Sequence, residues 1–244
     1  MKWLPTAALS LSVAACAGHS PSQLRSGPPS LNVAEAALAG GMPETALSIS
    51  RAVLETQPRN VPALLKQGEA LLALGHPAEA EECFRRAAAA DPRSDVALLD
   101  LGRLQLADGK PDAAEASFRS ALVLRQNQPA ALNDLGIALD LQGRQPEAQA
   151  AYRSALGAAP QDVAARNNLS LSLAIGGHAD EAVPALRALA EAQEAPPRVR
   201  ENLAFALSMG GANQEAQSVL EADMPPDQAT AALAGFQMFR SGTP

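Results

Sequence analysis

The feature that most constrains this chain of 244 residues is a series of six glycines spaced 34 residues apart. Glycine accepts the left-handed backbone conformation that ends many helices, so each of these glycines predicts a helix end. An alanine follows each glycine by five residues, and its small side chain lets two helices approach closely. The glycines are Gly41, Gly75, Gly109, Gly143, Gly177 and Gly211, and the alanines are Ala46, Ala80, Ala114, Ala148, Ala182 and Ala216. The series predicts six copies of one helix–turn–helix unit.

Residues 129–162 form the clearest copy of this unit. Its characteristic residues are Leu135, Gly136, Ala148, Tyr152, Ala155 and Pro160. Their spacing is typical of the tetratricopeptide repeat, a helix pair that cannot bury its apolar face alone and stacks on further copies. We therefore expect an all-α tetratricopeptide-repeat superhelix (α-solenoid) of about six helix pairs over residues 31–226.

The three central repeats combine a glycine in the first helix with an aromatic residue in the second. These residues are Gly68, Gly102 and Gly136, and Phe84, Phe118 and Tyr152. We interpret the aromatic side chains as core, because they recur at one repeat position. The outer repeats carry other residues at both positions, as expected where an array meets solvent or a cap.

Composition supports a helical fold and excludes one class of partner. Hydrophobic residues make up 47% of the chain but aromatic residues only 3%, so good helix formers such as Ala and Leu dominate. The formal net charge is −7, and the basic residues form no run. Nucleic-acid binding needs clustered Lys and Arg, so we expect no nucleic-acid partner.

The N-terminal residues indicate export and a membrane anchor. Residues 1–15 have one basic residue, a short apolar run and small residues before Cys16. The run is too short to span a membrane, and its end resembles the lipobox of bacterial lipoproteins. That resemblance implies lipidation of Cys16 and, because Ala17 rather than Asp follows, the periplasmic face of the outer membrane. An ordinary signal peptide cleaved nearby is the alternative.

Two further segments flank the expected array. Residues 16–30 are rich in Pro, Gly and Ser, so we expect the lipidated cysteine to be followed by a flexible tether. Residues 227–240 follow a double proline and place Leu233, Phe236, Phe239 and Arg240 near helical spacing. We interpret them as a C-terminal capping helix, with a partner-binding face as the alternative.

The sequence shows no pattern typical of a catalytic or metal-binding site. The cysteines and histidines have no metal-ligand spacing, and no phosphate-binding loop or nucleophile–base pair is evident. Cys83, beside Phe84, is interpreted as a small buried apolar residue. We therefore expect no enzyme activity, no metal, no cofactor and no small-molecule substrate.

The remaining candidate for function is the concave face that the first helices of such arrays form, where peptides bind. The predicted partner-binding groove consists of Leu65, Leu99, Arg103, Asn133, Ile137, Asn167, Leu171 and Phe205. Asn133 and Asn167 could bond to a peptide backbone, because an amide both donates and accepts. Alternatively, the two asparagines bond across adjacent repeats and hold the stack together.

Several segments resemble one family of repeat lipoproteins. Residues 166–174 (RNNLSLSLA), 197–207 (PRVRENLAFAL) and 223–226 (DMPP), with the lipobox and the short final helix, resemble the TadD family of Tad (Flp) pilus assembly. The resemblance implies a non-enzymatic adaptor that assists assembly or localisation of a pilus secretin. The partner would be a secretin subunit or another assembly component.

Two other hypotheses remain open. The chain could be another periplasmic repeat lipoprotein, such as a type IV pilus pilotin or an adaptor in outer-membrane protein assembly. It could instead recruit a periplasmic protease or cell-wall enzyme through the same groove. Adjacent genes for a pilus secretin and its ATPase would favour the first interpretation.

Overall fold

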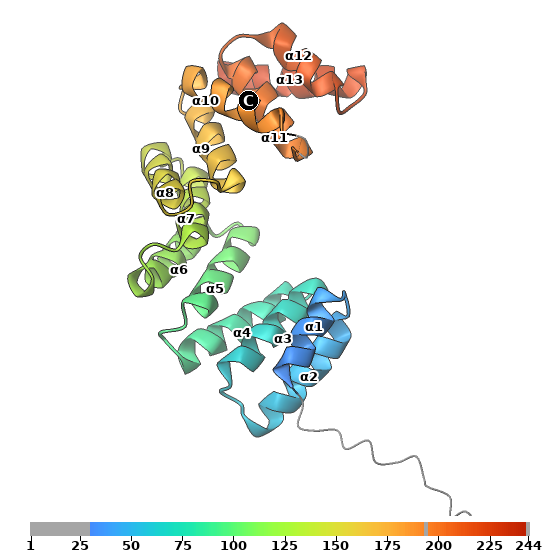
Figure 1. Ribbon diagram of the computed structural model, residues 1–244, viewed down its shortest axis with the longest axis vertical. Helices are drawn as coiled ribbons and strands as arrows, with labels where there is room; N and C mark the ends of the chain where they lie inside the picture. Colours follow the sequence, from blue (N-terminus) through green and yellow to red (C-terminus); the bar gives the residue numbers. More distant parts are fainter. Residues whose placement is uncertain (1–29, 193–194, 243–244) are drawn as a thin grey trace, which may run out of the picture.

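The computed structural model describes residues 30–192 and 195–242, and these residues form helices without strands (Figure 1). Six helix pairs are followed by one further helix, which confirms the predicted architecture. The helices are α1 (Leu31–Ala39), α2 (Pro43–Thr56), α3 (Val61–Ala73), α4 (Pro77–Ala90), α5 (Asp95–Ala107), α6 (Pro111–Leu124), α7 (Pro129–Leu141), α8 (Gln145–Ala158), α9 (Val163–Ile175), α10 (Ala179–Ala190), α11 (Pro197–Met209), α12 (Asn213–Glu221) and α13 (Pro226–Ser241).

Each glycine of the 34-residue series lies in the turn inside a helix pair. All six have positive φ, from 69° to 86°. In the first pair, Gly41 N donates to Leu38 O at 3.1 Å and Met42 N donates to Ala37 O at 2.8 Å. This is the Schellman motif, which satisfies the last carbonyls of the helix and requires a left-handed residue between them. The predicted role of these glycines is confirmed.

The two helices of a pair interlock through a small residue on one helix and a large one on the other. The six alanines of the series are fully buried. A Cβ atom placed on Gly136 would lie 2.4 Å from the Tyr152 ring, so the ring occupies the space that a side chain would need. Where serine replaces the glycine, at Ser170, the smaller Leu186 replaces the ring, and both are buried. The aromatic residues are therefore core.

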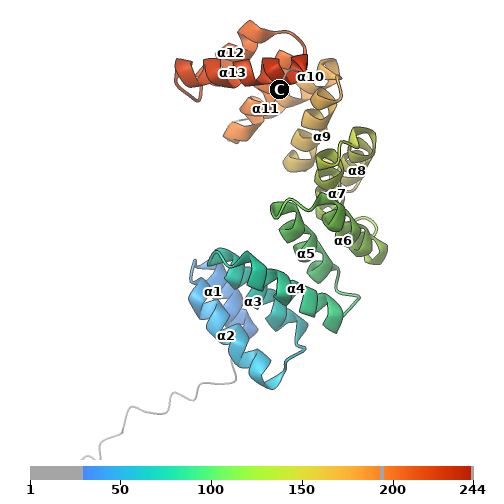
Figure 2. The ribbon, with the colours of Figure 1, turned by 180° about the vertical axis from the view of Figure 1, so that it is seen from behind.

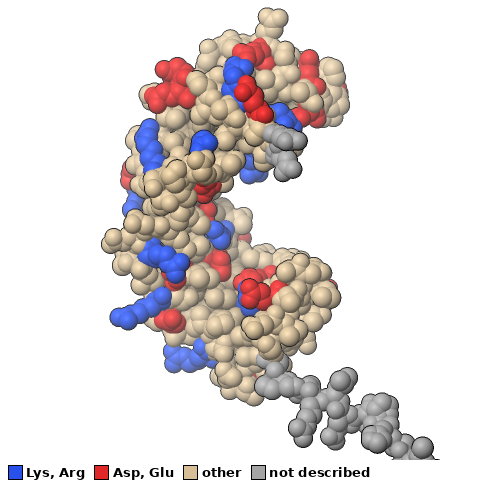
Figure 3. Space-filling view, viewed as in Figure 1, with Lys and Arg blue, Asp and Glu red and all other residues tan. Residues whose placement is uncertain are grey.

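The pairs stack so that the first helices form the inner face of a crescent. Helix α1 packs against α3. Further along the chain, α5 packs against α7, α7 against α9, α9 against α11, and α11 against α13. Second helices of neighbouring repeats do not pack against one another in the same way, so they lie on the outer face. The chain curves around a hollow that is visible in the space-filling view (Figure 3).

Helices α3 and α5 break this regular stacking, because they do not pack closely against each other. The first two pairs, α1–α4, consequently stand apart from the rest of the array in both ribbon views (Figures 1 and 2). The connection between the two parts is made by α4 against α5. The crescent thus has an N-terminal part and a longer C-terminal part.

Helix α13 closes the array where a seventh first helix would lie. It packs against α11 and α12, and Phe205 of α11 meets Phe236 edge to face at 5.3 Å between ring centroids. Arg240 Nη1 donates to the carbonyl of Ser208 at 2.8 Å. The helix begins at Pro226, one residue before the predicted segment, and Asp227 lies in its first turn.

The predicted signal peptide, Cys16 and most of the tether fall in residues 1–29, outside the described part of the chain. Ser30, the last residue of the predicted tether, precedes α1 in extended conformation. Among the described helices, none has both the length and the hydropathy needed to cross a membrane.

Candidate partner-binding surface

The predicted groove residues occupy two positions of the 34-residue repeat, the fifth and the ninth. We number each repeat from 1 to 34, with repeats starting at residues 27, 61, 95, 129, 163 and 197. The fifth position holds Leu65, Leu99, Asn133 and Asn167, and the ninth holds Arg103, Ile137, Leu171 and Phe205. Arg103 is exposed, and the other three ninth-position residues are partly exposed. The ninth position is therefore the more accessible of the two.

The fifth position is largely enclosed between neighbouring first helices. Leu99, Asn133 and Asn167 are only 6%, 8% and 6% exposed, whereas Leu65 is partly exposed. The structure thus brings Leu99, Asn133 and Asn167 to the seams between repeats, below the open face, whereas Glu201, at the same position of the last repeat, is exposed. Their assignment to a partner-binding groove stays a prediction.

A chain of side-chain hydrogen bonds runs along these seams through four repeats. Arg103 Nε donates to Asp134 Oδ2 at 2.7 Å, and Asn133 Nδ2 donates to Asp134 Oδ1 at 3.3 Å. Asn168 Nδ2 then donates to Asn133 Oδ1 at 3.0 Å, which joins α9 to α7.

The same pattern repeats one unit further on. Asn167 Nδ2 donates to Asn168 Oδ1 at 3.3 Å, and Asn202 Nδ2 of α11 donates to Asn167 Oδ1 at 3.0 Å. We call the set Arg103, Asp134, Asn133, Asn168, Asn167 and Asn202 the amide chain. Buried polar groups need such partners, because an unsatisfied buried amide destabilises a fold by about 1–3 kcal/mol. These bonds agree with the alternative interpretation, in which Asn133 and Asn167 bond across adjacent repeats.

A second set of hydrogen bonds, made by Asp140, links α7 to α9. The carboxylate of Asp140 accepts from Tyr152 Oη at 2.9 Å and from Ser172 Oγ at 2.7 Å. Burial raises the pKa of Asp140, although both hydrogen bonds act in the opposite direction. This contact and the amide chain together fix α9 against α7.

The ninth position changes character along the crescent. Glu35, Glu69 and Arg103 are its N-terminal members, and the last two form ion pairs with Lys66 and with Asp134. Ile137, Leu171 and Phe205 follow at the C-terminal end. The open face therefore passes from charged to apolar, and we call Ile137, Leu171 and Phe205 the apolar strip.

Close to Glu69 and Arg103, the carboxyl group of Asp100 has a raised pKa. Burial and the neighbouring Glu69 carboxylate raise the pKa of Asp100 to about 6, while Arg103 and Lys66 lower it. The Arg103 guanidinium lies 3.9 Å from Asp100 but 2.7 Å from Asp134, so Asp134 is its main partner.

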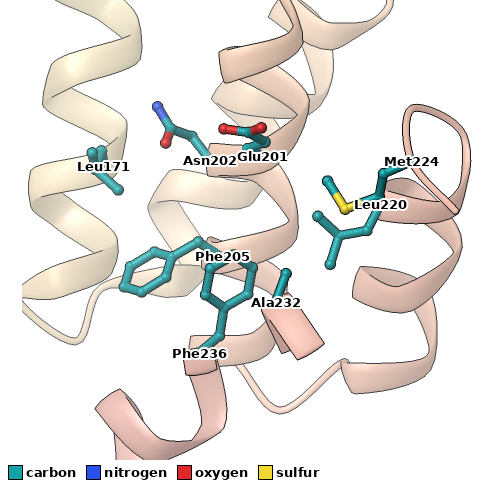
Figure 4. Close-up of a pocket in the computed structure, with 8 residues that line it drawn as sticks. All are labelled: Leu171, Glu201, Asn202, Phe205, Leu220, Met224, Ala232 and Phe236. Atoms are coloured by element: carbon teal, nitrogen blue, oxygen red, sulfur yellow. The ribbon is translucent and has the colours of Figure 1, made fainter. Parts of the chain in front are cut away.

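The apolar strip ends in a pocket at the C-terminal end of the crescent (Figure 4). The pocket has a volume of about 320 Å³ and is formed by α9, α11, α12, α13 and the turn after α12. Its lining residues are Leu171, Glu201, Asn202, Phe205, Leu220, Met224, Ala232 and Phe236. In Figure 4 the Glu201 carboxylate and the Asn202 amide lie toward one end of the pocket. The phenyl rings of Phe205 and Phe236 lie toward the other end.

Two of the predicted groove residues, Leu171 and Phe205, line this pocket. Sequence reasoning did not identify Asn202 and Met224 as part of a site, whereas Phe236 was placed on the apolar face of the final helix, with partner binding as the alternative. Phe239 follows Phe205 by 34 residues, and its ring lies 5.5 Å from that of Phe205. That spacing was a further signal that the final helix continues the inner face.

Two features of the described part of the chain bear on its chemistry, the grouping of its metal-ligating side chains and the state of its cysteine. The described residues contain no group of three His, Cys, Asp or Glu side chains that could hold a metal ion. Cys83 is buried and unpaired, and burial raises the pKa of its thiol, which makes the reactive thiolate scarce at neutral pH.

Comparison with known families defines the class of protein. Tetratricopeptide-repeat families match residues 37–100, 99–163 and 133–198. The chain therefore belongs to the tetratricopeptide-repeat proteins, a fold that serves as a protein-interaction module and is generally non-enzymatic. No curated protein matches the sequence.

Several solved structures share the fold. A tetratricopeptide repeat protein from Parabacteroides merdae has a TM-score of 0.72 and 17% identity over 86% of this chain and 87% of that one. PilW, described as a widely conserved type IV pilus biogenesis factor, has a TM-score of 0.71 and 22% identity over 82% and 96%. MamA has a TM-score of 0.57 and 23% identity over 76% and 92%. At these identities the likeness shows the fold.

Proposed function

We propose that this protein is a lipid-anchored periplasmic adaptor that assists assembly or outer-membrane localisation of a pilus secretin. It binds a secretin subunit, or another pilus assembly component, on the concave face. No turnover chemistry is involved. The lipidated Cys16 holds the chain to the periplasmic face of the outer membrane, and residues 17–30 let the array reach its partner.

The observation that carries the proposal is the apolar strip leading into the C-terminal pocket. Ile137, Leu171 and Phe205 are partly exposed on the inner face, and the pocket continues them. Concave faces of stacked repeats bind peptide segments, and accessible apolar side chains supply most of the favourable free energy. A strip of this kind suits a protein segment better than a small polar molecule.

Two further observations support the pilus role in particular. The segments at residues 166–174 and 197–207 resemble the TadD family, and both lie in first helices, α9 and α11, that line the inner face. PilW shows that another pilus biogenesis factor has this same fold. The fold is thus compatible with the role that the sequence resemblance implies.

The test is deletion of the gene, followed by analysis of secretin multimers in outer-membrane fractions. We expect multimers to be lost or to remain at the inner membrane. A Cys16→Ser variant should be made in normal amount but leave the membrane fraction, with the same effect on the secretin. Normal, correctly located multimers in the deletion strain would refute the secretin role, and unchanged membrane fractionation of Cys16→Ser would refute lipidation.

A further inference from the structure

The C-terminal pocket carries two polar groups that accept hydrogen bonds and lack a donor. Glu201 is exposed and forms no ion pair or hydrogen bond with any described residue. Asn202 uses its Nδ2 to donate to Asn167, which leaves its Oδ1 as an acceptor at the pocket wall. The two groups therefore present negative charge and lone pairs to whatever enters the pocket.

The rest of the lining is apolar and partly aromatic. Phe205 and Phe236 meet at 88° between ring planes, and Leu171 and Met224 enclose them from α9 and from the turn after α12. Glu201 and Phe205 are four residues apart on α11, so they lie on one face of that helix, one turn apart. A side chain with a long aliphatic stem and a cationic head fits this division, because the stem packs on the rings and the head reaches the acceptors.

A second cavity nearby differs from this pocket in its charged groups. It is lined by Arg187, Glu191, Arg200, Leu203 and Glu215, among others, on the other side of α11. There, Arg187 pairs with Glu215 at 2.6 Å, and Arg200 pairs with Asp223. The second cavity thus places basic groups of the chain beside its carboxylates, whereas the lining of the pocket at Glu201 contains no Lys or Arg.

We propose that this pocket takes an arginine side chain of the protein partner. The guanidinium donates to the Glu201 carboxylate and to Asn202 Oδ1, and the methylene groups lie against Phe205 and Phe236. Arginine suits the site better than a neutral side chain, because its planar group offers several donors and stacks on aromatic faces. A neutral apolar side chain would cover the carboxylate without replacing the hydrogen bonds that Glu201 makes with water.

The proposal rests on the proposed concave-face function and adds the chemistry of one contact. The apolar strip leads into this pocket, so a partner segment would place apolar residues along Ile137 and Leu171 and its arginine at the C-terminal end.

Met224 lines the pocket and therefore offers a local reporter of binding. Met42 lies in the turn between α1 and α2, away from the pocket, and serves for comparison. The full chain with ¹³C-labelled methionine methyl groups is titrated with N-acetyl-arginine methylamide. The matched probe is N-acetyl-citrulline methylamide, which has the same shape without the charge. The Met224 signal is assigned with Met224→Leu, and Met42 is the internal control.

We expect the arginine probe to shift the Met224 signal in a saturable way and to bind about tenfold more tightly than the citrulline probe. Glu201→Gln should remove this preference and leave citrulline binding unchanged. Glu44→Gln, at an exposed site on α2, should change neither. Equal binding of the two probes, a preference that survives Glu201→Gln, or no shift of Met224 would each overturn the proposal.

The outcome can be separated from that of the secretin experiment. Arginine binding at Met224 together with normal secretin multimers in the deletion strain would keep the pocket and remove the secretin role. Loss of multimers in the deletion strain without a preference for arginine would keep the adaptor and remove the arginine contact.

Discussion

The α3–α5 junction and the junctions within the C-terminal part of the crescent use the same repeat but join their first helices differently. The sixth register position holds Lys66 and Asp100 in α3 and α5, and Asp134, Asn168 and Asn202 in α7, α9 and α11. Between α7, α9 and α11, amides connect each helix to the next. At the α3–α5 junction, Asp100 instead faces the Glu69 carboxylate, and the two helices do not pack closely.

The difference indicates that the 34-residue pattern specifies each helix pair, while the polar residues at the seams differ from one junction to the next. Neutral amides both donate and accept, so they can bridge two helices across a buried seam. Two carboxylates cannot bridge without a proton or a cation between them. The helices that the amides bridge, α7, α9 and α11, also carry the apolar strip and most of the polar lining of the pocket.

The largest effect is expected from filling the space inside a helix pair. Gly136→Ala would place a methyl group 2.4 Å from the Tyr152 ring, and we expect it to destabilise the fold by about 2–3 kcal/mol. Gly157→Ala is the matched control in the adjacent helix, where nothing lies within 4 Å, and should be neutral or stabilising by up to about 1 kcal/mol.

Thermal unfolding followed by circular dichroism measures both variants. The double variant Gly136→Ala/Tyr152→Leu should recover part of the lost stability, because it imitates the natural combination of Ser170 with Leu186 but also removes the Tyr152 hydroxyl that donates to Asp140. Equal stability of Gly136→Ala and the wild type would contradict the interlocking of glycine and ring.

A smaller effect is expected from cutting the amide chain. Asn168→Ala removes the donor to Asn133 and the acceptor for Asn167, which leaves two buried amides short of a partner. We expect a loss of about 1–2 kcal/mol and faster hydrogen exchange in α7 and α9. Asn32→Ala, at an exposed site of α1, is the control. Unchanged exchange in α7 and α9 would show that the chain does not hold the stack.

The smallest effect, of opposite sign, is expected at the α3–α5 junction. The folded-state pKa of Asp100, about 6, lies above its ordinary value of 3.8, so the ionised form destabilises the folded state. Asp100→Asn should therefore stabilise the protein by about 1 kcal/mol at pH 7. Its advantage should fall by about half at pH 5, because the folded wild type gains a proton as the pH drops through 6.

Denaturant unfolding at the two pH values measures this difference, and Glu35→Gln on α1 controls for the loss of one exposed charge. A destabilised Asp100→Asn, or an advantage that grows at pH 5, would show that the Arg103 ion pair outweighs burial and Glu69 at this site.

The sequence predicted the repeat and the hairpin turns because both depend on local requirements. A positive φ at Gly41 or Gly143 needs glycine, and full burial of Ala148 between two helices needs a small side chain, so each requirement leaves a residue at a fixed spacing. The capping helix was predicted for a similar reason, since Pro225 and Pro226 interrupt one helix and begin the next.

The sequence could not place the candidate site in the same detail. Which residues of a first helix remain accessible depends on how closely neighbouring repeats approach, and this buries Asn133 and Asn167 while leaving Leu171 partly open. The pocket depends on the angle at which α13 docks against α11, and the 34-residue spacing does not determine that angle. Of the amide chain, only the bonding of Asn133 and Asn167 across adjacent repeats was foreseen, as an alternative, because their donors Asn168 and Asn202 lie in other repeats.

The most direct test of the central claim is site-specific photo-crosslinking in the cells that make this protein. A photoreactive phenylalanine analogue replaces Leu171 on the inner face or, as the matched control, Val123 on α6, which is 78% exposed. If the apolar strip binds the partner, position 171 yields an adduct that mass spectrometry identifies as a secretin subunit or another pilus assembly component, and position 123 yields none. Adducts with that partner at position 123 and none at position 171 would contradict the account.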